Sequence, residues 1–132
     1  MRNETDADRL AVLAVIKAGY AAWEANDVDE FVAGYLDDAT VVQPGTYKRN
    51  RDEIRNTMAA GFAGPLKGSC VIDTPGDVRL VNAETAIVVS EGGIVFAGET
   101  ASPPDRMVRA TWVVVKRDGR WLIAAYHNSP AG

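Results

Sequence analysis

The feature that most constrains this chain is a pair of apolar runs between Thr111 and Asn128, joined by Asp118-Gly119. An Asp-Gly pair between runs rich in β-branched and aromatic residues is typical of a β-hairpin. Both runs are apolar at odd and even positions alike, which predicts that neither face of the hairpin is open to bulk water. Other elements, or a second subunit, must therefore cover both faces.

The N-terminal half predicts three amphipathic helices with matching start signals. They run from Thr5 to about Asn26, from Asp27 to Asp37-Asp38, and from Asn50 to a stop before Pro65. Each start pairs a capping residue with an acidic residue three positions on, as in a capping box. The agreement of three start signals supports the boundaries.

The rest of the chain predicts strands. They are expected over Ala39–Gln43, Ser69–Leu80 with a bulge or kink at Pro75-Gly76, Thr85–Glu91 before a break at Gly92-Gly93, Arg106–Arg117 and Arg120–Asn128. The segment Ile94–Asp105 fits a lid, a dimer contact or a plain surface hairpin. Together these elements predict one α+β domain over 1–132, with three helices on a curved antiparallel sheet. Such a cone-shaped arrangement leaves space for an internal pocket.

Composition excludes several classes of function. The 132 residues carry 14 basic and 18 acidic side chains, a net charge of −4, and the only dense basic run is 48–51. This argues against nucleic-acid binding. A single cysteine, Cys70, allows no intrachain disulfide and favours a reducing cytoplasm, and no run is long enough for a membrane helix. His127 is the only histidine, so that a site built on several His ligands is impossible and no metal or cofactor is expected.

Two parts of the sequence resemble a known superfamily. Ala22-Trp23, Asp27-Val28-Asp29, Phe31–Tyr35, Asp38–Val42 and Pro44 resemble the N-terminal signature of the nuclear transport factor two-like superfamily. That superfamily includes ketosteroid isomerases, SnoaL-type polyketide cyclases and kinase association domains. Glu91-Gly92-Gly93, Gly98-Glu99, Thr111-Trp112 and the run from Asp118 to Pro130 resemble its SgcJ/EcaC group.

The resemblance implies both a fold and a biological setting. It implies a cone fold with an internal pocket for a hydrophobic small molecule, and homodimers formed sheet to sheet. Members of the SgcJ/EcaC group occur in actinobacterial antibiotic pathways, including enediyne biosynthesis, which implies a polyketide-like ligand. Their oxidoreductase label finds no support here, because Gly92-Gly93 and Gly98 lack the strand-turn-helix context of a dinucleotide fingerprint.

The isomerase machinery does not carry over to this chain. The position of the isomerases' general base, before the proline that ends the first strand, holds Gln43, and an amide cannot abstract a proton. The position of their oxyanion-binding tyrosine holds Gly19. Tyr20 is adjacent in sequence but lies about 100° further around a helix.

The predicted ligand-binding residues are Trp23, Gln43, Trp112, Tyr126 and Asn128. Strand alternation puts Tyr126 and Asn128 on one face, together with Leu122 and Ala124. Asn128 also matches an arginine that lines the pocket of the kinase association domains. The same alternation places Trp121 and Ile123 on the dimer face.

The position of Trp112 depends on the hairpin turn. A bulged three-residue turn, with Lys116 opposite Arg120, puts Trp112 on the pocket face and is the turn predicted here. Trp23 and Trp112 then form aromatic walls, although both also fit a plain core role.

Catalysis stays open at this level. The candidate acids or bases are Glu91, Tyr20 and His127, with His127 expected near the dimer side or rim and Glu91 facing Arg106 as an ion pair. Three functions remain: a binding protein for a small molecule, a cofactor-independent isomerase or cyclase, and a non-catalytic association module.

Overall fold

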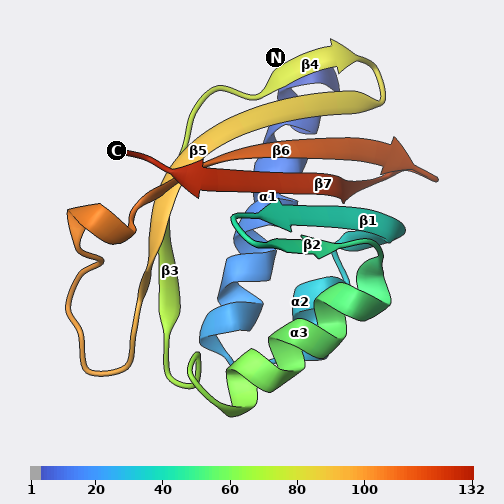
Figure 1. Cartoon of the computed structure of the whole chain (residues 1–132). Helices are drawn as coiled ribbons and strands as arrows, with labels where there is room; N and C mark the ends of the chain where they lie inside the picture. Colours follow the sequence, from blue (N-terminus) through green and yellow to red (C-terminus); the bar gives the residue numbers. More distant parts are fainter. Residues whose placement is uncertain (1–3) are drawn as a thin grey trace.

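The structure, a computed structural model, describes residues 4–132 and has helices on the concave side of one curved sheet (Figure 1). The helices are α1 (Glu4–Glu24), α2 (Val28–Val32), α3 (Arg51–Ala63) and the short 3-10 helix η1 (Pro104–Arg106). The strands are β1 (Tyr35–Gln43), β2 (Thr46–Lys48), β3 (Cys70–Pro75), β4 (Arg79–Asn82), β5 (Thr85–Val95), β6 (Val108–Arg117) and β7 (Arg120–Pro130). None of the described helices has the length and apolar character needed to span a bilayer.

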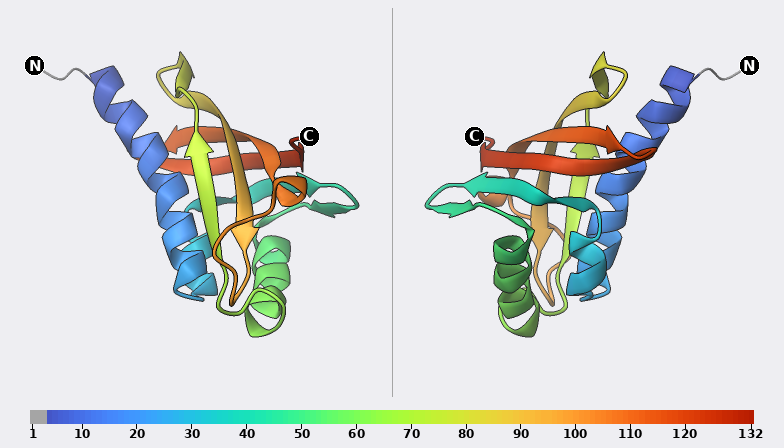
Figure 2. Two further views of the ribbon diagram at one scale, coloured as in Figure 1. Left: turned by 90° about the vertical axis from the view of Figure 1, so that its left-hand side faces the viewer. Right: turned by 90° about the vertical axis from the view of Figure 1, so that its right-hand side faces the viewer.

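The seven strands form one sheet in the order β2-β1-β7-β6-β5-β3, and β4 also pairs with β5. Neighbouring strands are antiparallel except β1 and β7, which run parallel. The parallel pair departs from the antiparallel sheet expected from sequence, and is possible because α3, η1 and five strands separate β1 from β7 along the chain. The sheet curls around α1, with α2 and α3 closing its lower end (Figure 2).

The capping predictions hold for two helices. The Asp27 carboxylate accepts from the Glu30 backbone N–H at 3.1 Å, and the Asn50 side chain accepts from the Glu53 backbone N–H at 2.9 Å. The predicted pairing of Thr5 with Asp8 does not describe the first helix, which already includes Thr5. The carboxylate of Asp8 instead accepts from Trp121 Nε1 at 2.9 Å.

The core lies between α1 and the concave face of the sheet. Val12 of α1, Val88 of β5, Val114 of β6 and Ile123 of β7 are at most 1% exposed. Trp121 is also buried, so the prediction that Trp121 and Ile123 face a dimer partner is wrong. Both side chains belong to the core.

The β6–β7 hairpin has a two-residue turn and not the expected bulged one. Arg117 lies opposite Arg120, and Asp118 and Gly119 have φ values of 52° and 78°, as a type I′ turn requires. The extra residue lies further along the strand. Between the pair Val113–Ala125 and the next pair of the ladder, Ala124 has no partner, which makes it a β-bulge.

The bulge at Ala124 reverses the side-chain alternation of β7. Before it, Trp121 and Ile123 face the core; after it, Tyr126 and Asn128 face the same side. Trp112 lies opposite Tyr126, and so it is on the pocket face as predicted, but for a different reason. Leu122 and Ala124 do not line the pocket, contrary to expectation, because Leu122 precedes the change of phase and Ala124 is the bulged residue itself.

Three other boundaries differ from the predictions. The second helix ends at Val32, and its expected last turn forms the start of β1, where the register shifts between Tyr35 and Thr40. The expected strand Ser69–Leu80 divides at Pro75 into β3 and β4, because proline has no N–H to continue the ladder. Conversely, β5 continues through Gly92-Gly93 to Val95.

The segment after β5 is a closed loop that leads into η1. Glu99 accepts from the Phe96 backbone N–H at 2.8 Å and forms an ion pair with Arg106 at 2.5 Å. The Arg106 guanidinium lies 4.6 Å from the centre of the Phe96 ring. These contacts bring the loop against β5 beside Gly93.

Candidate functional site

A cavity of about 150 Å³ lies between the helices and the concave face of the sheet. Its aromatic lining comes from α1, α2, β1, β6 and β7: Tyr20, Trp23, Phe31, Tyr35, Trp112 and Tyr126. Its polar lining consists of Gln43, Lys48, Asp73, Arg106 and Asn128. An engineered cavity of similar volume in another protein holds a benzene-sized molecule, so this one has room for about one ring.

All five predicted ligand-binding residues line this cavity: Trp23, Gln43, Trp112, Tyr126 and Asn128. The Trp112 and Tyr126 ring centres are 4.4 Å apart, and Tyr20 meets Trp112 edge to face at 5.9 Å. Trp112 is 3% exposed and packs in the core, so it is a core residue and a pocket wall at once. That a ligand contacts these residues stays a prediction.

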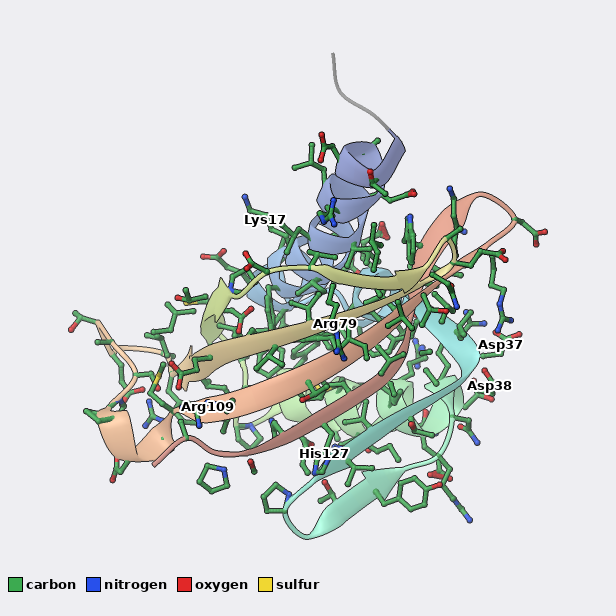
Figure 3. The ribbon with its side chains drawn as sticks, turned by 90° about the horizontal axis from the view of Figure 1, so that it is seen from above. Lys17, Asp37, Asp38, Arg79, Arg109 and His127 are labelled. Atoms are coloured by element: carbon green, nitrogen blue, oxygen red, sulfur yellow. The ribbon has the colours of Figure 1, made fainter. Side chains whose placement is uncertain are left out.

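Of the three acid-base candidates, Tyr20 lines the cavity, whereas Glu91 and His127 are exposed on the opposite, convex face of the sheet. Figure 3 shows His127 on the side of the sheet away from α1. The expected ion pair between Glu91 and Arg106 is wrong. Glu91 lies opposite Arg109 in the β5–β6 ladder and pairs with it at 2.5 Å, since cross-strand neighbours on one face are closest.

The carboxylate inside the cavity is Asp73 of β3, which the sequence analysis missed. Asp73 lies opposite Gly92, and its Oδ1 is 2.7 Å from the point where a side chain at position 92 would begin. The Asp73 carboxylate therefore occupies space that a side chain at position 92 would fill. The sequence signal was an aspartate directly after the apolar run Cys70–Ile72, but its face could not be assigned without the pairing to Gly92.

Two neighbouring side chains set the surroundings of Asp73. Trp112 Nε1 donates to Ser90 Oγ at 3.0 Å, and Ser90, only 2% exposed, lies close enough to Asp73 to lower the pKa of its carboxyl group. Because the Trp112 N–H occupies a lone pair of Ser90 Oγ, the Ser90 hydroxyl proton can point to Asp73. Burial raises the pKa of Asp73, and Ser90 opposes part of that rise.

Two tyrosine hydroxyls accompany this carboxylate. Burial, and then the negative charge of Asp73, raise the pKa of Tyr20. Burial also raises the pKa of Tyr126, while a hydrogen bond from Asn128 acts in the opposite direction. Asn128 Nδ2 donates to the Tyr126 hydroxyl oxygen at 2.8 Å, so the Tyr126 proton is available to another acceptor. Both tyrosines are therefore neutral hydrogen-bond donors at physiological pH.

The ends of β1 and β2 add a further polar group to the lining. Lys48 Nζ donates to Gln43 Oε1 at 2.7 Å, which fixes the amide oxygen and leaves the amide nitrogen as the donor. Burial lowers the pKa of Lys48. Within residues 4–132, no three His, Cys, Asp or Glu side chains gather closely enough to hold a metal ion.

Solved structures with the same fold include three of particular interest. A domain of unknown function with a cystatin-like fold from Nostoc punctiforme aligns with a TM-score of 0.85 and 23% identity, over 99% of this chain and 80% of the other. A putative scytalone dehydratase from Novosphingobium aromaticivorans aligns with a TM-score of 0.81 and 19% identity, over 97% and 87%. A ketosteroid isomerase-like protein from Erwinia carotovora atroseptica aligns with a TM-score of 0.77 and 20% identity, over 99% of both chains.

Because all three identities are below 25%, these similarities establish the fold alone. A comparison with functionally curated proteins gave no significant match. The sequence profile of the SnoaL-like domain, in contrast, matches residues 12–132, which include every described residue that lines the cavity. The chain therefore belongs to the SnoaL-like domain family.

Proposed function

We propose that this protein binds a small, ring-bearing hydrophobic molecule and catalyses a cofactor-independent proton transfer on it. The observation that carries the proposal is the position of Asp73, a carboxylate that lines an aromatic cavity in the space left by Gly92. Such a site favours an apolar reacting group over water. A raised pKa makes the carboxylate a stronger base.

The geometry suits abstraction of a proton from a carbon next to a carbonyl group. The C–H electron pair would pass into the carbonyl π system, and the proton would move to the Asp73 carboxylate. The hydroxyls of Tyr20 and Tyr126 could then donate to the carbonyl oxygen as it gains negative charge. Return of the proton to another carbon gives an isomerisation, and loss of a hydroxyl group as water gives a dehydration.

The size of the cavity limits the ligand. About 150 Å³ accommodates one ring, so a polyketide-like molecule would place one ring inside and the rest at the mouth. The SnoaL-like family and the names of two structural neighbours, a dehydratase and a ketosteroid isomerase-like protein, fit this chemistry. A role in actinobacterial antibiotic biosynthesis, as the SgcJ/EcaC resemblance implies, and a cytoplasmic location are part of the proposal.

The test is exchange of carbon-bound hydrogen in deuterated buffer, with 2-tetralone as the probe and NMR as the measurement. We expect the protein to accelerate exchange next to the carbonyl, with a rate that rises as pH passes the raised pKa of Asp73. Asp73→Asn should lower the acceleration at least ~100-fold, the usual scale for loss of a general base. The variant should fold normally, because a buried amide costs less than a buried carboxylate.

Glu91→Gln is the matched control, since it removes a carboxylate from the convex face. It should leave the exchange rate unchanged. Equal rates for the wild type and Asp73→Asn would rule out Asp73 as the base. Binding of 2-tetralone without any exchange would favour the binding-protein alternative, and absence of binding would favour the association module.

A homodimer formed through the convex face of the sheet is a second part of the proposal. That face carries an in-register row across four strands: Val42, His127, Thr111 and Val89. Val89 is 47% exposed although it lies on a long central strand. The two valines of this row fit a surface that another subunit covers.

A further inference from the structure

Arg106 lines the cavity, and contacts with Glu99, Phe96 and the Ile94 backbone hold most of its guanidinium group in place. Its Nη2 donates to Glu99 Oε1 at 2.5 Å and to the Ile94 carbonyl oxygen at 2.9 Å, and its Nη1 donates to Glu99 Oε2 at 3.2 Å. The group also packs over Phe96 at 4.6 Å. These contacts fix the plane of the guanidinium, so its remaining donors have set directions.

The Nε of Arg106 is buried and has no hydrogen-bond partner. Among the described side chains, only one other buried polar atom lacks a partner, Ser102 Oγ, and Ser102 packs beside Gly93 and does not line the cavity. Buried N–H groups nearly always have an acceptor, and guanidinium N–H groups most of all. The missing acceptor for Arg106 Nε is therefore expected to come from whatever occupies the cavity.

One basic side chain of the cavity has no carboxylate partner and can attract an anion. The described lining has one acidic side chain, Asp73, and two basic ones, of which Arg106 is paired with Glu99 and Lys48 is not. Lys48 bonds to the neutral Gln43 amide, and the ion pairs of the described residues give it no carboxylate. In Figure 1, η1 and the end of β7 lie on the left, and β1 points toward the same side.

We propose that the ligand of this cavity carries a carboxylate on or next to its ring, and that one carboxylate oxygen accepts the Arg106 Nε–H. The inference rests on the proposed function, because it names the class of substrate for the same site. In this arrangement the Arg106 end of the cavity orients the molecule, and the ring carbons face the aromatic walls and Asp73. A neutral oxygen would accept a weaker hydrogen bond from Arg106 Nε–H than a carboxylate does, and a ring compound without an acceptor would leave this N–H without a partner.

The test compares benzoate with benzyl alcohol, which has the same ring and a neutral polar group. Binding is followed by the fluorescence of the tryptophans, two of which line the cavity, and by the NMR signal of the Arg106 Nε–H. We expect benzoate to bind the wild type at least ~10-fold more tightly than benzyl alcohol, about the effect of one charge-assisted hydrogen bond. Benzoate, and not benzyl alcohol, should shift the Arg106 Nε–H signal.

Arg106→Lys keeps the charge beside Glu99 but removes Nε–H, and it should abolish the preference for benzoate. Arg109→Lys is the matched control, because Arg109 also forms a 2.5 Å ion pair but lies on the convex face. Equal binding of the two compounds, or a stationary Arg106 Nε–H signal in the wild type, would overturn the inference alone. Failure of both compounds and of 2-tetralone to bind would overturn the proposed function with it.

Discussion

At the scale of single residues, two aspartates show how position determines the pKa of a carboxyl group. A hydrogen bond from Trp121, and also Lys116, lower the pKa of Asp8, while burial raises that of Asp73. By linkage, the Asp8 contribution to stability is present above its unfolded pKa and is lost as pH falls through the lowered folded value. Asp73 acts in the opposite direction, because stability decreases as pH rises through its raised pKa.

Asp8→Asn tests the first of these effects. The variant keeps an acceptor for Trp121 Nε1 but loses the charge beside Lys116. We expect it to lower the free energy of unfolding at pH 7, with the difference from the wild type shrinking below about pH 4, where the unfolded carboxyl takes up its proton. Urea unfolding at a series of pH values measures this. Asp77→Asn, at an exposed position, is the control. A difference in unfolding free energy between Asp8→Asn and the wild type that does not change with pH would contradict the linkage.

At the scale of elements, two irregularities in regular strands build the site. The bulge at Ala124 changes the phase of β7, so that Tyr126 and Asn128 point into the cavity. On β5, Gly92 gives space to the Asp73 side chain of the neighbouring strand. A strand without either feature would pair equally well but would not bring these polar groups to one cavity.

Gly92→Ala should disturb the site and the pairing of β3 together. Its new Cβ would lie 2.5 Å from the Ile72 carbonyl oxygen and 2.7 Å from Asp73 Oδ1, so the backbone of β3 must shift. We expect the free energy of unfolding to fall by about 1–3 kcal/mol, the usual cost of overpacking. The variant should also lose the acceleration of hydrogen exchange in 2-tetralone.

Gly19→Ala is the control for this prediction. A Cβ there meets nothing within 4 Å, and in helix α1 the change should stabilise the fold by up to about 1 kcal/mol. Thermal unfolding of both variants provides the comparison. A Gly92→Ala variant as stable and active as the wild type would show that Asp73 does not depend on this space.

At the scale of the whole molecule, the two faces of the sheet have different roles. The concave face carries the core and the cavity, whereas the convex face carries the row from Val42 to Val89 and the exposed His127 (Figure 3). The apolar character of the hairpin on both faces, noted from the sequence, thus has two explanations. One face is covered by α1, and the other is the face on which we propose a second subunit.

The dimer proposal predicts that the chain sediments as a dimer at micromolar concentration. Thr111→Lys should produce monomers, because a two-fold interface brings two copies of the new charge close together and buries both. Asn56→Lys, on the exposed face of α3, adds the same charge elsewhere and should leave the dimer intact. A wild type that sediments as a monomer would remove the proposed role of the convex face.

Much of the architecture follows from local signals in the sequence. Asp27 and Asn50 cap their helices as predicted, since capping depends on residues only three positions apart. Asp118-Gly119 determines the hairpin because its backbone needs positive φ at both positions. The five predicted pocket residues also line the cavity, four of them from stretches that resemble the family signature, and Gln43 directly before its proline.

The phase of a strand is not a local property, and here only the tertiary structure decided it. Position 124 bulges because Trp121 and Ile123 must enter the core while Tyr126 and Asn128 must face the cavity, and a strict period of two cannot satisfy both. Asp73 became a candidate base only through its pairing with Gly92, a residue 19 positions away. The sequence by itself therefore determined most of the elements and the cone, and long-range strand pairing determined which carboxylate lies inside it.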